Sequence, residues 1–244
     1  MFLYCFFLYF FMLIQCIIKY IRVGVITMLA FAVASIDEWI NVKKIYQVND
    51  NLIYESPYGE YFIMKINHTE CLFYRGQVRK ILSAASCQYM IDHFDIDRII
   101  VIGTCAGVNR KHHELDIFQF VSTYQSDCMV YELTGQLCKG EVELYCYDKL
   151  SFLKKGKIST MDKTLILKKD EELLNNENID CDDMESAAVA MVCSIHSLPC
   201  TIIKGISDFA NGIENYNTQC DKYVKNTAII MDKICNEILP IIID

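Results

Sequence analysis

Short apolar runs rich in β-branched residues alternate along this 244-residue chain with longer segments of helical periodicity. Three of these runs, residues 22–28, 98–102 and 200–206, are apolar on both faces, which is typical of strands that helices cover on each side. The alternation predicts an α/β fold, a single domain with a mixed central β-sheet flanked by helices. Because ligands of such sheets bind at the carboxyl ends of strands, the residues that follow each run are the candidates for function.

Local patterns complete this outline. The helical spacing of apolar residues predicts helices over residues 30–42, 78–94, 186–195 and 218–238. Alternating patterns predict further strands over residues 44–48, 61–67, 71–74 and 117–121. The charged, Asn-rich stretch 168–183 is typical of a solvated loop or a short helix, and we expect it to add little to the core.

The composition excludes several classes of protein. With 53% hydrophobic and 22% charged residues the chain can bury a sizeable core, which excludes disorder. Its net charge of −8, without a basic stripe, argues against a nucleic-acid partner, because binding phosphates requires clustered Lys and Arg. The 13 cysteines include no C-x-x-C pair and no Cys/His spacing of the zinc type. We therefore expect no metal site and a reducing, cytoplasmic location.

The first 18 residues carry no charge, and Lys19 and Arg22 follow them. This length is close to the ~20 apolar residues that cross a bilayer, and the positive residues after it would keep the rest of the chain in the cytoplasm. One expectation is therefore an uncleaved membrane anchor. The other is a translation start further along the chain, for instance at Met12. In both cases residues 1–20 form an apolar N-terminal segment and residues 21–244 form the folded domain.

Three predicted strand ends carry residues that could bind a ligand. Residues 103–107 form a small-residue turn whose backbone N–H groups could approach a flat or anionic molecule. Residues 183–186 place acidic side chains at the start of a helix, a position that the helix dipole alone would favour. Residues 205–208 place a carboxyl after a strand, where it could cap the next turn. Each segment has a structural explanation when taken alone, so only their combination is informative.

The segments V-I-G-T-C-A-G (101–107), D-M-E-S-A-A-V-A (183–190) and K-G-I-S-D-F-A (204–210) resemble, in the same order and at similar separations, those of the nucleoside phosphorylase/nucleosidase superfamily. The resemblance spans about residues 23–239. It is strongest to the nucleosidases of methionine salvage that hydrolyse 5'-methylthioadenosine and S-adenosylhomocysteine. It implies a phosphorylase/hydrolase-like fold, an adenine nucleoside as substrate, no cofactor, and a homodimer in which the partner completes the pocket.

Breaking a purine N-glycosidic bond creates a positive ribosyl centre and a negative base, so the site needs a proton donor for the base and an anchor for the sugar. The resemblance implies that Asp208 is the donor, acting at the purine N7, and that Ser207 holds it. It also implies that Glu185 accepts hydrogen bonds from the ribose hydroxyls, with Met184 packed under the sugar. The other pocket residues that it implies are Thr104, Cys105, Ala106 and Ala210.

The chain departs from the family pattern where the attacking nucleophile is held. Phosphorylases carry an arginine two residues before the glycine of the first motif, where this chain has Val101, so we expect water rather than phosphate as the acceptor. The stretch matched to the glutamate-rich run of the nucleosidases is Ala-Phe-Ala at 30–32, which predicts that the water-activating glutamate is absent. Lys204 replaces an arginine and is a weaker bidentate partner.

Other functions stay open on these grounds. Without the glutamate, the protein could be a catalytically silent nucleoside-binding module, and a nucleoside phosphorylase is a further alternative. Residues 103–107 also fit G-x-C-x-G, the cysteine form of a nucleophile elbow, with His112 and His113 nearby in sequence, which would make Cys105 the nucleophile of a thiol hydrolase. An elbow requires a helix directly after the nucleophile, and residues 108–114 show no helical periodicity, so this alternative is weaker.

Overall fold

The structure is a computed structural model that describes residues 28–128, 130–131, 137–138, 140–163, 172, 174–175, 177–209 and 216–243. The predicted N-terminal apolar segment and the predicted site residue Ala210 lie outside these ranges. Within them, no helix combines the length and the apolar character needed to cross a membrane.

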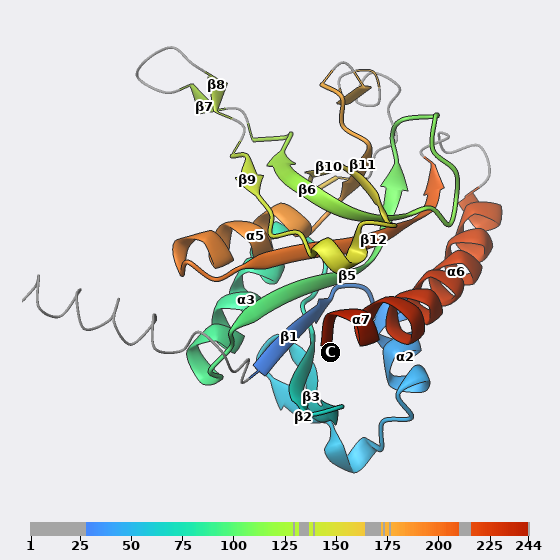
Figure 1. Cartoon of the computed structure of the whole chain (residues 1–244). Helices are drawn as coiled ribbons and strands as arrows, with labels where there is room; N and C mark the ends of the chain where they lie inside the picture. Colours follow the sequence, from blue (N-terminus) through green and yellow to red (C-terminus); the bar gives the residue numbers. More distant parts are fainter. Residues whose placement is uncertain are drawn as a thin grey trace, which may run out of the picture.

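A ten-stranded mixed sheet forms the centre of the molecule, with strand order β11-β10-β6-β12-β5-β1-β4-β3-β2 and β9 paired to β6 (Figure 1). Its strands are β1 (Met28–Val33), β2 (Tyr54–Ser56), β3 (Gly59–Ile66), β4 (Thr69–Arg75), β5 (Arg98–Gly107), β6 (Ile117–Gln125), β9 (Val142–Glu143), β10 (Lys154–Thr160), β11 (Cys181–Asp183) and β12 (Cys200–Phe209). Strands β1, β5 and β12 are neighbours and run parallel, so their carboxyl ends meet at one edge. A separate small sheet pairs β7 (Val130–Tyr131) with β8 (Leu137–Cys138).

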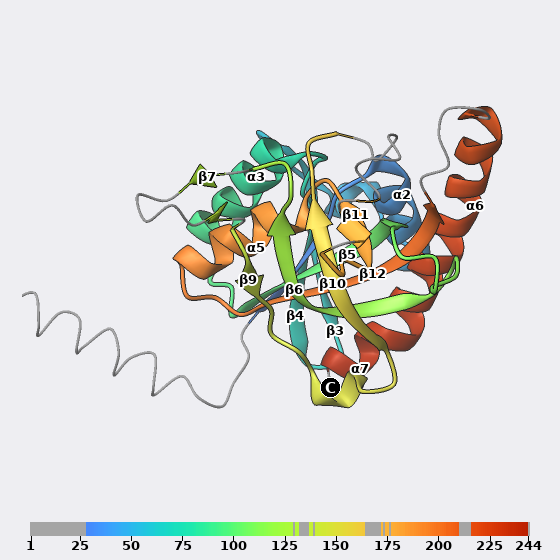
Figure 2. The same ribbon diagram turned by 90° about the horizontal axis from the view of Figure 1, so that it is seen from above.

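Helices cover the two faces of the sheet in pairs (Figures 1 and 2). Helix α3 (Lys80–His93) packs with α5 (Ser186–Ile195) on one face, and α2 (Ile36–Ile45) packs with α6 (Tyr216–Lys233) on the other. The chain continues through a π-helical turn η3 (Ile234–Ile238) into α7 (Leu239–Ile243), and single 3-10 turns occur at η1 (Asp50–Leu52) and η2 (Asp148–Leu150). Because successive residues of a strand face opposite sides, Ile99 and Val101 of β5 join the core under α3 and α5, whereas Ile100 and Ile102 join the core under α2 and α6.

The structure confirms the predicted α/β fold with a mixed sheet between helices, but three local predictions are wrong. Residues 30–33 were expected in a helix and instead belong to β1, because the run Met-Leu-Ala-Phe-Ala-Val is buried on both faces between β4 and β5. The helix begins only after Ser35, whose side chain accepts a hydrogen bond from the Glu38 backbone N–H and caps α2.

Two further segments also differ from the expectation. Residues 44–48 were predicted as a strand, but α2 runs to Ile45 and a turn follows, with Gln47 at φ 50°. Residues 181–183, which end the stretch predicted to be solvated, form the buried strand β11. This strand pairs antiparallel with the end of β5, through Cys181 with Gly107 and Asp182 with Ala106. It therefore brings acidic residues to the same edge of the sheet as the end of β12.

Candidate active site

A cavity of about 320 Å³ lies at the carboxyl ends of β5 and β12. Seven of the eight site residues predicted from the sequence line it: Thr104, Cys105, Ala106, Met184, Glu185, Ser207 and Asp208. The fold thus brings the three sequence motifs to one place. Their roles in binding and catalysis stay predictions.

Asp208 lies near the end of β12, just after a bulge in its pairing with β5. Ser207 Oγ donates a hydrogen bond to Asp208 Oδ1 over 2.5 Å, and Asn226 Nδ2 on α6 donates to the Ser207 carbonyl over 2.7 Å. Burial raises the pKa of Asp208 above its ordinary value; the hydrogen bond from Ser207 lowers it, and the charge of Glu114 raises it again. A carboxyl with a raised pKa holds its proton to higher pH, which suits a general acid.

Glu185 directly precedes α5 and is buried beside Asp183 and Lys204. The Lys204 ammonium lies 2.7 Å from Asp183 Oδ2 and 3.2 Å from Glu185 Oε2. Asp183 also accepts hydrogen bonds from the backbone N–H groups of Glu185 and Ser186, so it caps the first turn of the helix. Burial raises the pKa of Glu185 to about 7, although the charge of Lys204 lowers it. Lysine at this position therefore pairs with two carboxylates at once.

Glu38 also lines the cavity, and the sequence analysis missed it. It is the third residue of α2 and is 2% exposed. Its Oε1 accepts hydrogen bonds from the Thr104 backbone N–H over 2.6 Å and from the Thr104 hydroxyl over 2.8 Å, and its Oε2 accepts one from the Ser35 backbone N–H over 2.9 Å. The match of residues 30–32 to the segment after the first strand is wrong, because these residues lie inside β1 and the segment that follows it contains Glu38.

One feature of the sequence could have identified Glu38, and one feature of the structure shows how closely its carboxylate is packed. Ser35 and Glu38 have the S-x-x-E spacing of a capping box, and both hydrogen bonds of that motif are present. Gly103 has a φ of +152°, and a Cβ at this position would lie 2.8 Å from Glu38 Cδ, so only glycine leaves room for the carboxylate. Tyr223 on α6 donates a hydrogen bond to Ser35 Oγ over 3.0 Å and supports the cap from the opposite side.

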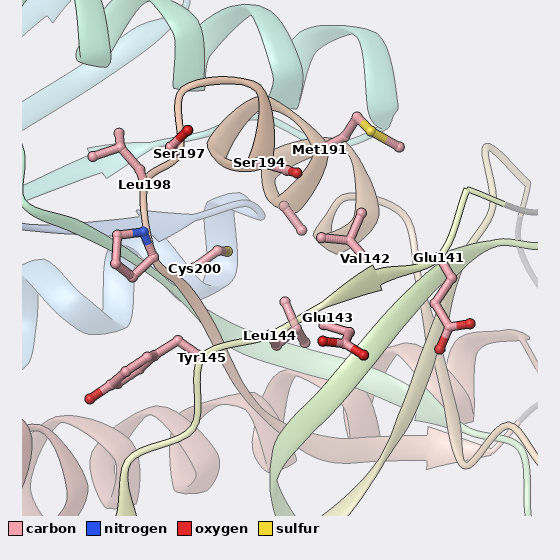
Figure 3. Close-up of a pocket in the computed structure, with 12 residues that line it drawn as sticks. Glu141, Val142, Glu143, Leu144, Tyr145, Met191, Ser194, Ser197, Leu198 and Cys200 are labelled. Carbon is pink, nitrogen blue, oxygen red and sulfur yellow. The ribbon is translucent and has the colours of Figure 1, made fainter. Parts of the chain in front are cut away.

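A larger cavity, of about 620 Å³, lies elsewhere, between α5, the segment around β9 and the start of β12. Figure 3 shows Met191 on α5 on one side of it, and Glu143 and Tyr145 on the segment along the other side. Cys200, which begins β12, is one of its lining residues, so this cavity is at the amino end of that strand. Ligands of parallel strands bind at the carboxyl ends, and the clustered carboxyls line the smaller cavity, so the smaller one is the candidate active site.

Comparisons with known proteins find similar sequences and similar folds. The model of the phosphorylase superfamily matches residues 151–236. A 5'-methylthioadenosine/S-adenosylhomocysteine nucleosidase of Buchnera aphidicola is 25% identical over 87% of this chain and 88% of its own length, and an aminodeoxyfutalosine nucleosidase of Campylobacter jejuni is 24% identical over 72% and 83%. The crystal structure of a mutant Helicobacter pylori nucleosidase with 5'-methylthioadenosine in its active site superimposes with a TM-score of 0.74 at 19% identity, over 88% of this chain and 98% of that one. These matches confirm the resemblance found in the sequence: the chain is similar to the phosphorylase superfamily over residues 151–236 and to nucleosidases over most of its length.

Proposed function

We propose that this protein is a purine nucleosidase that hydrolyses the N-glycosidic bond of an adenine nucleoside of the methylthioadenosine/S-adenosylhomocysteine type, a reaction of methionine salvage. The observation that carries the proposal is that Asp208, Glu185 and Glu38 line one cavity at the carboxyl ends of parallel strands. The names of the similar proteins support the reaction class, because one is a 5'-methylthioadenosine/S-adenosylhomocysteine nucleosidase and another is an aminodeoxyfutalosine nucleosidase.

Asp208 acts on the base of the substrate, and Glu185 acts on its sugar. As the bond breaks, negative charge collects on the base, and Asp208 with its raised pKa donates a proton to a ring nitrogen. The sugar becomes positive at the same time. Glu185 accepts hydrogen bonds from the ribose hydroxyls and, when ionised, stabilises that positive charge. Met184, next in sequence, lines the cavity and packs against the sugar.

Glu38 supplies the base that the reaction needs for water. Its oxygens are held by backbone N–H groups of two separate segments, at Ser35 and Thr104, so the carboxylate is fixed in direction. A carboxylate fixed in this way can accept a proton from a water molecule on the sugar side of the cavity. A catalytically silent module was an alternative because such a glutamate was expected to be absent, and the position of Glu38 in the cavity favours the enzyme over that alternative.

Electrostatics favours water over phosphate as the attacking group. Five carboxyl side chains line the cavity: Glu38, Asp182, Asp183, Glu185 and Asp208. Among the described lining residues, Lys163 is the one that carries a positive charge. Proteins bind phosphate with clustered Arg and Lys side chains, and Lys163 by itself does not form such a cluster, whereas a neutral water molecule needs none. The hydrolase is therefore favoured over the phosphorylase.

The thiol-hydrolase alternative is disfavoured by the surroundings of Cys105. Strand β5 continues through Cys105 to Gly107, and the described chain then forms turns rather than the helix that a nucleophile elbow requires. The thiol points toward the Gly205 carbonyl at 3.5 Å. His112 is bound to Asp180, with 2.8 Å between Nε2 and Oδ1, and so is not oriented as a base for the thiol.

A direct test measures the release of adenine from 5'-methylthioadenosine by the full-length protein, with wild type, Asp208→Asn, Glu185→Gln and Glu38→Gln. We expect release by the wild type and a loss of roughly 10²–10⁴-fold in Asp208→Asn and Glu38→Gln, the range for removing one acid or base. Glu143→Gln, in the larger cavity, is the matched control and should retain full activity. No release by the wild type, or equal release by all variants, would refute the proposal.

We also propose that the active form is a homodimer. Ile36 and Ile40 lie one turn apart on α2, beside the cavity, and are 47% and 52% exposed. Such exposed apolar side chains at a site rim are typical of a covered interface. The mass in solution, measured by light scattering, should be twice that of the chain, and Ile40→Glu should halve it.

A further inference from the structure

Asp182 lines the candidate site, yet the mechanism above gives it no role. The residue is 3% exposed, and its Oδ1 has no hydrogen-bond partner among the described residues. Its neighbour Asp183 differs in this respect, because Asp183 accepts hydrogen bonds from Ser186 and pairs with Lys204. Proteins seldom keep an unpaired polar atom in the interior, and such an atom beside a ligand cavity indicates a bond that the ligand completes.

The register of three strands shows where Asp182 lies relative to the proposed acid. Ala106 of β5 pairs with Asp182 on one side and with Asp208 on the other. Residues directly opposite each other on paired strands place their side chains on the same face. Since strands are about 4.8 Å apart, the backbones of Asp182 and Asp208 are separated by about 10 Å. All three residues line the cavity, so one carboxyl lies on each side of Ala106.

The protonation state of Asp182 decides what it can bind. Burial raises its pKa well above the ordinary value, the neighbouring Asp183 raises it further, and a hydrogen bond from Ser159 lowers it. A carboxyl that keeps its proton offers one O–H donor and one carbonyl acceptor, side by side. This pair matches an edge on which a ring nitrogen lies next to an exocyclic group, as it does in adenine.

We propose that Asp182 is a specificity-determining residue, whose carboxyl binds the ring nitrogen and exocyclic group of the purine while Asp208 protonates the imidazole ring on the opposite side. The assignment rests on the proposed nucleosidase function. It requires the base to lie along Ala106 between the two carboxyls, with the sugar toward Glu185 and Glu38. A purine without the exocyclic group would lose the second hydrogen bond and would be a poorer substrate.

The test compares two 5'-methylthio nucleosides, one carrying adenine and the other carrying unsubstituted purine, with wild type, Asp182→Leu and Asp182→Asn. Leucine has a similar volume and removes both hydrogen bonds, whereas asparagine keeps a donor and an acceptor. We expect Asp182→Leu to lower kcat/KM for the adenine nucleoside by roughly 10–100-fold, the effect of losing two hydrogen bonds to the base. For the purine nucleoside, which makes one of these bonds, kcat/KM should fall by a smaller factor of roughly 3–10-fold, so the preference for adenine shrinks. Asp182→Asn should retain most of the wild-type preference.

An equal loss on both nucleosides in Asp182→Leu, or an unchanged preference, would overturn the assignment. The melting temperature of Asp182→Leu is measured in parallel, and if that variant does not fold, loss of the preference in Asp182→Asn would overturn it instead. Failure of the proposed function is distinguishable, because the wild type would then release no base from either nucleoside. In that case calorimetry with free adenine and free purine makes the same comparison, and a wild type that binds both equally would refute the role of Asp182.

Discussion

Lys204 Nζ lies 3.2 Å from Glu185 Oε2, and both side chains are more than nine-tenths buried. Asp183 shares the same ammonium at 2.7 Å. Burial by itself lowers the pKa of Lys204, but the charges of Asp183, Glu185 and Glu38 raise it well above its ordinary value. The lysine is therefore a fixed positive charge that lets Asp183 and Glu185 lie close together in the cavity with less mutual repulsion.

Replacing Lys204 by methionine should destabilise the fold strongly. The variant keeps the length of the side chain but leaves Asp183 and Glu185 buried without their counter-charge, and breaking a buried pair in this way costs ~3–5 kcal/mol. Urea unfolding followed by circular dichroism measures the change. Lys65→Met, at an exposed position on β3, is the control and should stay within ~0.5 kcal/mol of the wild type. Equal stability of both variants would mean that the buried pair contributes nothing.

Glu185 makes the stability of the protein depend on pH. Its pKa is raised from 4.5 to about 7 on folding, so folding takes up a proton between these values. The stability that protonated Glu185 contributes is full below pH 4.5 and is lost as the pH rises through 7. The free energy of unfolding of the wild type, minus that of Glu185→Gln, should therefore fall by up to ~1.4 kcal/mol per pH unit across this range. Urea unfolding at a series of pH values measures it, and a flat difference would contradict the shift.

The order of the elements and the main site motifs could be predicted from the sequence because they depend on local signals. The runs at 98–102 and 200–206 are apolar on both faces, and their strands continue into the predicted motif residues 103–107 and 207–208. Burial on both faces is a property of the residues themselves, so these two strands need no knowledge of their neighbours.

Glu38 and Asp182 could not be placed by the same reasoning. An apolar segment such as residues 28–33 fits a helix or a strand until its neighbours β4 and β5 are known. Because these residues were assigned to a helix, the end of the first strand was placed too early and Glu38 was not considered for the site. Asp182 lies in a stretch of charged residues that is typical of solvent-exposed segments, and it is buried by pairing with Ser159 of β10 on one side and Ala106 of β5 on the other. Non-local pairing overrides local composition in both places.

The rate should depend on pH through Asp208, and two neighbours should move that dependence in opposite directions. Because the acid must hold its proton, kcat/KM falls as the pH rises through the pKa of Asp208. Ser207 lowers this pKa and Glu114 raises it. Ser207→Ala should therefore shift the descending limb of the pH profile to higher pH, and Glu114→Gln should shift it to lower pH. Asp208→Asn should remove the limb. Shifts of the same sign in both variants would contradict the assignment of the acid.

Gly103→Ala should reduce activity by displacing Glu38. An added Cβ would meet Glu38 Cδ at 2.8 Å, and the φ of +152° is one that alanine rarely adopts, so the carboxylate or the strand must move. We expect kcat to fall roughly 10²-fold, as for a misplaced catalytic group, with a stability loss of ~1–3 kcal/mol. Gly76→Ala is the matched control, because its Cβ would make only ordinary contacts, at 3.5 Å or more. Adenine release and urea unfolding are measured on both variants. If Gly103→Ala loses stability but keeps the wild-type kcat, the position of Glu38 does not limit the reaction and its role as the base is wrong.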